Sequence, residues 1–343
     1  MASGSLPIFI LNGSPTERGR KHGAVLSRLI NARFCKLRRS AEAFAWRDAK
    51  SLAAKSFEQI VRLAPDVALE LEGIADGAEL AVLDIYLLSC FEYFAEGRTG
   101  CTSAGLCTPQ GAILGQNWDA PAEEGGDIVV FLHEDANERF MTVASAGTLG
   151  WVGINGNGLA FVNNDLILDS RLDGLPSLVI RRMMLGAPNA AKAVDLLRQN
   201  PHMSGRCFLV GDATGVLRVA EVAPGVGVVD EAAQSMIHTN HPLFPAVAMW
   251  ENGEAAARLY PSSHERLRAA SHLSLTSIDD IKILLRDRSG APDAICKSVS
   301  VREATETAFS VIFDCGRREV LIAAGRPDLC SYQHLKLLQG AEV

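Results

Sequence analysis

One cysteine, Cys101, follows a glycine where the sequence changes from a helical pattern to a strand pattern. Gly100 has no Cβ, so it tolerates unusual backbone conformations and leaves its carbonyl open to attack. A thiol that attacks the carbonyl of its own preceding peptide forms a thioester, and hydrolysis then frees a new N-terminal cysteine. The new α-amine, with a pKa of about 7.7–8, can accept a proton from a thiol of pKa about 8.5. This is the chemistry of an N-terminal nucleophile; the alternative is a buried thiol that packs as a small hydrophobe.

Two polar side chains further along the chain could assist such a cysteine. Asp119 follows residues 112–118, which we expect to form a hairpin with 102–107 and so to return Asp119 towards Cys101. There it would orient the new amine or hold a neighbouring cation, although an aspartate at a strand end also commonly caps a turn. Asn240 could donate its side-chain NH₂ to a developing oxyanion, a role worth about 3–4 kcal/mol in other enzymes. The alternative for Asn240 is an ordinary turn asparagine.

Arg326 and two histidines complete the set of candidate groups. Arg326 follows a strand pattern at 319–323 and could bind a carboxylate or form a bidentate pair with Asp119, unless it is a surface arginine. His238 and His241 invite a metal interpretation, but no third ligand has a suitable spacing and HExxH is absent, so we predict no metal site. Either histidine could instead be the base of a conventional cysteine hydrolase that does not cut itself.

The elements that must position these groups change in type near residue 100. Before it, apolar residues recur at helical spacing; after it, short strands alternate with turns such as Asn-Gly-Asn-Gly at 155–158. We expect helices at 18–37, 61–80, 82–94, 177–185, 189–199, 263–272 and 278–286. We expect strands at 6–11, 102–107, 112–118, 127–133, 140–146, 151–154, 159–163, 207–210, 216–222, 227–230, 308–313 and 319–323. Antiparallel strands interrupted by helix pairs predict layered α+β packing.

The composition limits the class of protein. The chain has 343 residues, 48% of them hydrophobic and 21% charged, which is typical of a globular protein with a sizeable core. A formal charge of −7 without a basic stretch argues against nucleic acid as a partner, and no apolar run is long enough to span a membrane. The eight cysteines form no CxxC pair, and residues 6–11 lack the flanks of a signal peptide. We therefore expect free thiols in the cytoplasm.

Six short motifs occur in an order that resembles a known family. They are residues 13–19 with His22-Gly23, then 72–78, 100–103, 115–119, 238–241 and 325–327. In this order the chain resembles the autoproteolytic acyltransferases related to fungal acyl-CoA:6-aminopenicillanic acid acyltransferase, also called isopenicillin N acyltransferase. The motifs extend from about residue 8 to about residue 330.

The resemblance implies a fold and a processing event. The fold would be that of the N-terminal-nucleophile hydrolases, an α+β sandwich of four layers in the order α-β-β-α. Self-cleavage between Gly100 and Cys101 would leave residues 1–100 as a mostly helical chain and residues 101–343 as the chain that carries the nucleophile. Together the two chains would form one domain.

The resemblance also implies roles for individual residues. Cys101 would be the nucleophile with its freed amine as base, Asn240 would match the oxyanion residue, and Asp119 and Arg326 would support the site. Three residues beside Cys101 in the motifs are expected to contact substrate; these are Thr102, Ser103 and Trp118.

We therefore expect a self-processing amidohydrolase or acyltransferase. It would act on a small N-acyl amide or acyl thioester through a Cys101 thioester, with hydrolysis favoured because transfer needs a second binding site. No cofactor is expected, although acyl-CoA could serve as a co-substrate. The expected partners are the acyl substrate and, after cleavage, the two chains for each other, without nucleic acid or membrane. The alternative is an unprocessed scaffold that binds acylated metabolites without turnover, because the amine of Cys101 stays tied in a peptide bond.

Overall fold

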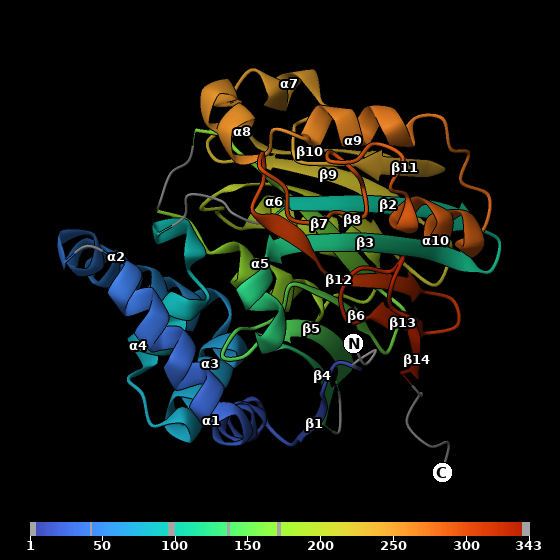
Figure 1. Ribbon diagram of the computed structural model, residues 1–343. Helices are drawn as coiled ribbons and strands as arrows, with labels where there is room; N and C mark the ends of the chain where they lie inside the picture. Colours follow the sequence, from blue (N-terminus) through green and yellow to red (C-terminus); the bar gives the residue numbers. More distant parts are fainter. Residues whose placement is uncertain (1–4, 42, 95–99, 136–137, 170–172, 338–343) are drawn as a thin grey trace, which may run out of the picture.

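Two β-sheets lie face to face and carry helices on their outer sides (Figure 1). The computed structural model describes residues 5–41, 43–94, 100–135, 138–169 and 173–337. Strands β2 and β3 contact β7 and β8 of the other sheet directly, and one continuous apolar cluster fills the space between the sheets. The predicted four-layer α-β-β-α arrangement is confirmed.

The larger sheet has eight strands. In order across the sheet they are β1 (Ile8–Asn12), β4 (Ile128–Glu134), β5 (Arg139–Ser145), β6 (Val152–Asn155), β7 (Ala160–Leu166), β8 (Gly205–Gly211), β9 (Leu217–Ala223) and β10 (Gly227–Ala232). All neighbouring pairs are antiparallel except β1 and β4, which are parallel. The first segment of the chain therefore supplies an edge strand to a sheet that is otherwise built from residues beyond 127.

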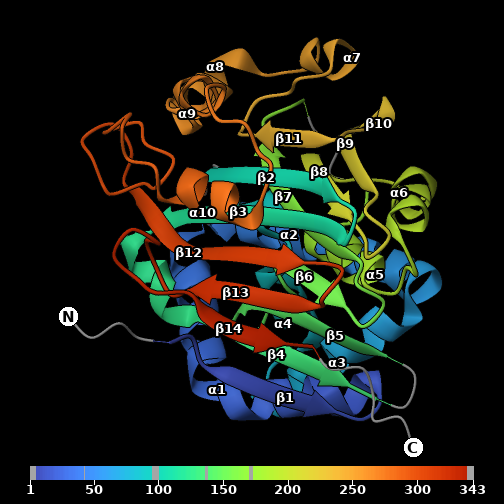
Figure 2. The ribbon, with the colours of Figure 1, turned by 90° about the vertical axis from the view of Figure 1, so that its right-hand side faces the viewer.

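The smaller sheet has six strands and carries the candidate nucleophile. In order they are β11 (Ser235–His238), β2 (Gly100–Thr108), β3 (Gly111–Pro121), β12 (Thr305–Asp314), β13 (Glu319–Ala323) and β14 (Gln333–Lys336). Figure 2 shows this sheet with β2 and β3 beside each other near its upper edge. The predicted hairpin forms, and Gly111 at its turn has φ 134°, a conformation that favours glycine.

Helices cover the outer faces of both sheets. The helices before the nucleophile are α1 (Pro15–Ser40), α2 (Ala43–Leu63), α3 (Pro65–Ala78) and α4 (Val82–Leu88), followed by the short 3₁₀ helix η1 (Phe91–Tyr93). The later ones are η2 (Ala122–Asp127), α5 (Ser177–Met184), α6 (Ala190–Gln199), α7 (Pro245–Ala248), α8 (Gly253–Leu259), α9 (Ser263–Ala270) and α10 (Ile278–Arg286). Helix α6 packs on β8, β9 and β10, whereas α9 contacts β11 and α10 contacts β3.

Helices α1 and α3 pack more closely than side chains usually allow. A Cβ on Gly23 of α1 would lie 2.2 Å from the carbonyl oxygen of Ile74, and one on Gly77 of α3 would lie 2.1 Å from that of Arg20. Gly19 and Gly73 meet the facing helix in the same way. These four glycines of the first two motifs, residues 13–23 and 72–78, are thus explained by backbone contact between the two helices, since only glycine permits this approach.

The structure departs from the expected elements in a few places. Helix α2 (Ala43–Leu63) was not predicted apart from its last residues, because the helix expected at 61–80 starts only where α2 ends. The expected helix corresponds mainly to α3, which Pro65 starts, since proline has no N–H to continue α2. Strands β11 and β14 and helices α7 and α8, each four to seven residues long, were also not predicted.

All eight cysteines are free thiols, as predicted. Among the helices that the structure describes, none is long and apolar enough to cross a lipid bilayer.

Candidate active site

The β2–β3 hairpin sets Cys101 and Asp119 beside the same peptide bond but on opposite faces of the sheet. Cys101 is paired with Trp118, and Gly100 is paired with Asp119. Gly105 approaches Leu217 of the larger sheet, whereas Gly115 approaches Ile281 of α10. Because side chains alternate along a strand, Cys101 and Trp118 point between the sheets, and Asp119 points towards the outer helices.

The backbone of Cys101 is held at both of its polar atoms. Its N–H donates to Oδ1 of Asn240 at 2.9 Å. Its carbonyl oxygen accepts from Nη1 of Arg266 at 2.6 Å and from Nδ2 of Asn164 at 3.0 Å. The residue is 4% exposed. The bond that the sequence predicts to be cut therefore lies in a fixed and buried position.

The thiol of Cys101 is a weak acid in this uncut chain. Burial, and after it the negative charge of Asp119, raise the pKa of the thiol to about 12. A hydrogen bond with Gln116 and the positive charges of Arg181 and Arg266 act in the opposite direction. Thiolate formation near neutral pH therefore needs a base close to the sulfur.

Asn240 lies just beyond the end of β11 and contacts Cys101 near the start of β2. Besides Cys101, its Oδ1 accepts from Nη2 of Arg266 at 2.8 Å. Its Nδ2 donates to the carbonyl of Asp165 at 3.1 Å, and its backbone N–H donates to Oγ of Ser263 at 2.8 Å. The side chain thus presents its oxygen to the nucleophile, whereas the predicted oxyanion role uses the nitrogen.

Asp119 is completely buried beside Gly100. Its Oδ1 accepts from Thr307 at 2.8 Å, and its Oδ2 lies 3.7 Å from Nζ of Lys297. Burial raises the pKa of Asp119, and the charge of Lys297 partly offsets that rise. Lys297 also contacts Glu303 at 2.7 Å, so a buried lysine bridges two carboxylates next to the predicted cleavage site.

Arg326 is engaged elsewhere. It forms a bidentate pair with Asp328, with Nε 3.1 Å and Nη2 2.6 Å from the two carboxylate oxygens. The cation next to Asp119 is Lys297. The structure thus gives the cation role predicted for Arg326 at Asp119 to a lysine from a different loop.

The three residues expected to contact substrate, Thr102, Ser103 and Trp118, lie on opposite faces of the smaller sheet. Trp118 stacks on Trp151 and Phe309 at ring distances of 5.0 and 5.4 Å and lies on the same face as Cys101. Ser103 shares that face, and its Oγ is buried with no hydrogen-bond partner among the described residues. Thr102 lies on the other face, where its hydroxyl accepts from Arg266 at 2.9 Å.

Three site residues were missed by sequence reasoning: Arg266, Asn164 and Lys297. Arg266 lies on the inward face of α9 with Ser263 and Ala270, so a charged residue at an apolar helical position was an available signal. Asn164 stands in a buried strand, where asparagine is disfavoured. Lys297 lies in a loop, and nothing in its neighbours distinguishes it.

The two histidines are occupied by other partners. Nε2 of His238 lies 2.9 Å from Glu221, and Nδ1 of His241 lies 2.8 Å from Oγ of Ser263. Burial lowers the pKa of His241 to about 3. With its ring nitrogens bonded to Glu221 and to the Thr239 carbonyl, His238 is poorly suited to act as a base for Cys101.

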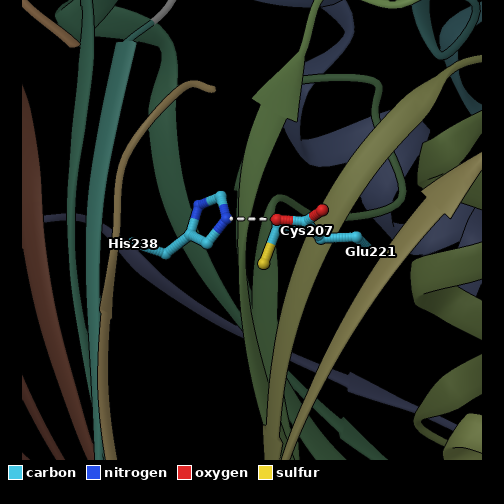
Figure 3. A group of neighbouring side chains, drawn as sticks. All are labelled: Cys207, Glu221 and His238. Atoms are coloured by element: carbon cyan, nitrogen blue, oxygen red, sulfur yellow. Dashed lines mark hydrogen bonds and ion pairs between the residues drawn. The ribbon is translucent and has the colours of Figure 1, made fainter. Parts of the chain in front are cut away.

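The fold brings to His238 the further metal-binding side chains that spacing did not show. The donor atoms of Cys207, Glu221 and His238 lie within 4.8 Å of one another in the space between the sheets (Figure 3). By type these three groups could hold a metal ion such as zinc. Hydrogen bonds already occupy the carboxylate and both ring nitrogens.

Residues 106–329 match a family model described as acyl-coenzyme A:6-aminopenicillanic acid acyl-transferase. The chain is 30% identical over 292 residues to the acyl-coenzyme A:6-aminopenicillanic-acid-acyltransferase 40 kDa form of Emericella nidulans, a match that covers 80% of this chain and 79% of that protein.

Among solved structures, penicillin V acylase from Agrobacterium tumefaciens aligns with 14% identity and a TM-score of 0.42, over 65% of this chain and 82% of that one. A mutant conjugated bile acid hydrolase from Clostridium perfringens aligns with 11% identity and a TM-score of 0.43, over 69% and 96%.

Proposed function

Because this chain belongs to the acyl-coenzyme A:6-aminopenicillanic acid acyl-transferase family, we propose that it is a self-cleaving enzyme whose N-terminal Cys101 carries the acyl group as a thioester. The observation that carries the proposal is the hydrogen bond from the Cys101 N–H to Asn240. It holds the nitrogen that becomes the free amine, and it does so beside a glycine whose peptide bond is flanked by Asp119 and Lys297.

Self-cleavage begins with attack of the Cys101 sulfur on the carbonyl carbon of Gly100. The C–N bond breaks, the thiol proton passes to the departing nitrogen, and a thioester joins the two segments. Water then hydrolyses the thioester to give the Gly100 carboxylate, a free thiol and a free amine. A Cβ at position 100 would lie 3.2 Å from Oδ2 of Asp119 and 3.3 Å from Nζ of Lys297, so glycine leaves room for the carbonyl to move.

Turnover then uses the groups that processing has released. The amine, with a reference pKa of about 7.7–8, takes the proton of the thiol, and the thiolate attacks the acyl carbonyl of the substrate. The substrate amine or thiol leaves, and water releases the acid. Asn240 holds the amine through Oδ1 and donates to the oxyanion through Nδ2, which leaves the Asp165 carbonyl for that purpose.

The proposed substrates are small N-acyl amides or acyl thioesters, with hydrolysis favoured over transfer. The relative from Emericella nidulans is named for acyl transfer from coenzyme A, so acyl-CoA is a co-substrate to be tested here. No cofactor or metal is required by this chemistry. We propose a cytoplasmic enzyme, since free thiols are typical of reducing compartments.

Denaturing mass spectrometry of the purified protein tests the self-cleavage. We expect two chains, residues 1–100 and 101–343, and one intact chain for Cys101→Ala. Cys90→Ala is the matched control, because Cys90 is also a buried free thiol and its loss should leave the cut unchanged. An intact wild-type chain that stays intact would refute the proposal and favour a binder of acylated metabolites without turnover.

A substrate screen then separates hydrolysis from transfer. N-acyl amino acids, aminoacyl amines, penicillins and acyl-CoA thioesters are offered with and without an added amine acceptor. Release of free acid at the same rate with or without the acceptor supports hydrolysis. An acylated acceptor as the main product would assign transfer instead.

A further inference from the structure

A buried group of three side chains joins the two sheets next to the site. His238 on β11 points across the gap to Glu221 on β9, and Cys207 on β8 lies beside them (Figure 3). All three are fully buried. The chemistry proposed for Cys101 uses none of them.

Both ring nitrogens of His238 face acceptors. Nδ1 lies 2.7 Å from the carbonyl of Thr239, and Nε2 lies 2.9 Å from Oε1 of Glu221. A carbonyl cannot donate, so Nδ1 carries a proton, and a second proton must lie between Nε2 and the carboxylate. The Nε2–Oε1 distance is that of a hydrogen bond, so a proton alone accounts for this contact.

Glu221 also binds the far end of the segment that begins at His238. Its Oε1 accepts from the backbone N–H of Leu243 at 2.6 Å, and its Oε2 accepts from that of Phe244 at 3.1 Å. One carboxylate on the larger sheet therefore holds both ends of residues 238–244. Asn240 lies between these ends and meets Cys101.

We propose that Glu221, through His238 and the N–H groups of Leu243 and Phe244, is a positioning residue that fixes residues 238–244 so that Asn240 meets the Cys101 nitrogen. The effect of Glu221 on catalysis rests on the proposed function, whereas its effect on the position of residues 238–244 rests on the contacts alone. Glu221 touches neither Cys101 nor any reacting atom, so it acts only through this segment.

Hydrogen–deuterium exchange tests the positioning in a chain that cannot react. In the uncut Cys101→Ala protein, Glu221→Gln should speed exchange at least about tenfold in residues 238–244 and at the amide of position 101. Glu70→Gln is the control, because Glu70 is an equally buried carboxylate that pairs with Arg182 at 2.8 Å on a different helix. Glu70→Gln should leave the exchange rates in residues 238–244 and at position 101 unchanged.

A second pair of variants separates positioning from general loss of stability. With Asn240→Ala already present, Glu221→Gln should no longer change exchange at position 101, because the contact that it supports is gone. Should Glu221→Gln fail to fold, Glu221→Asp keeps the charge but shortens its reach, and the same segment should exchange faster. Unchanged exchange in residues 238–244, or equal effects of Glu70→Gln, would overturn the proposal.

Kinetics of the cut enzyme give the functional readout. Glu221→Gln should lower kcat about tenfold to a hundredfold and leave KM within about threefold, because it moves a positioned group without touching substrate.

The outcomes separate this inference from the proposed function. If the wild-type chain is not cut but the exchange result is as expected, the positioning role of Glu221 is supported and the proposed function is refuted. If wild type is cut but exchange is unchanged, only the role of Glu221 falls. One equivalent of bound zinc that is lost in Cys207→Ala would show that a metal, and not a proton, joins His238 to Glu221, and would overturn the role of His238 in the proposal.

Discussion

Oδ1 of Asn240 accepts a hydrogen bond from the backbone N–H of Cys101, across 139 positions of sequence. The same oxygen accepts from Arg266, whose guanidinium also binds the Cys101 carbonyl. The peptide units on both sides of Cys101 are therefore held in place by the folded chain itself. Preorganisation of this kind reduces the reorganisation required in the transition state.

Asn240→Ala should slow both self-cleavage and turnover by about a hundredfold or more, because it removes the acceptor for the nitrogen and the proposed oxyanion donor together. Timed denaturing mass spectrometry and steady-state kinetics measure the two rates. Asn31→Ala is the control, since that amide binds carbonyls of Ser27 and Ala78 in the helical layer. Rates equal to those of wild type would remove Asn240 from the mechanism.

Arg266→Lys should lower the rates of self-cleavage and of turnover by about tenfold to a hundredfold. A lysine ammonium cannot reproduce the planar fork that reaches Cys101, Thr102 and Asn240 at once, and hydrogen bonds of charged groups are worth about 1.5–3 kcal/mol. Arg268→Lys on the same helix is the matched control, because Arg268 is exposed. A similar loss of rate in the two variants would mean that the reaction responds to any change in α9, and not to the Arg266 guanidinium in particular.

Self-cleavage of newly made chain should accelerate with pH. Burial, and then Asp119, hold the pKa of the Cys101 thiol at about 12, so the thiolate fraction rises about tenfold for each pH unit below that value. Cell-free synthesis followed by a pH jump and quenched mass spectrometry gives the rate between about pH 6 and 9. A rate that is flat over this range would show that thiolate formation does not limit the cut.

Gly23→Ala should destabilise the protein by about 1–3 kcal/mol, since a methyl group there meets a backbone carbonyl that cannot move aside. Urea unfolding of the Cys101→Ala chain measures the change without interference from processing. Gly253→Ala is the control; it starts α8 in open space, so helix propensity should make it neutral or slightly stabilising. Equal stability of the two variants would contradict the close packing of α1 on α3.

Much of the fold follows from local pattern. The hairpin of β2 and β3 was predicted from strand patterns around a glycine turn, and α10 from its apolar spacing. The parallel pairing of β1 with β4 could not be predicted, because nothing local in residues 8–12 specifies which strand they join. Strand β11 has only four residues, too few for periodicity to show.

The parts of the candidate site formed by neighbours in sequence could be predicted. The ion pairs between residues that are distant in sequence could not. Gly100-Cys101 could be recognised as a unit. The cation at Asp119 could not be predicted, because Lys297 comes from a loop that is distant in sequence and Arg326 pairs with Asp328, a carboxylate close to it in sequence. The fold places Asn240 beside Cys101, but which end of its amide faces the nucleophile depends on Arg266 and Asp165, which only the fold assembles.

The position of β1 has a thermodynamic consequence for a chain that is cut after Gly100. Residues 8–12 supply an edge strand to a sheet whose other strands all lie beyond the cut, and α1 and α3 bury the same core. Unfolding of the cut protein would then release two molecules from one. Its melting temperature would rise with protein concentration, whereas that of an uncut chain would not. The enzyme would behave as an obligate heterodimer encoded by one reading frame.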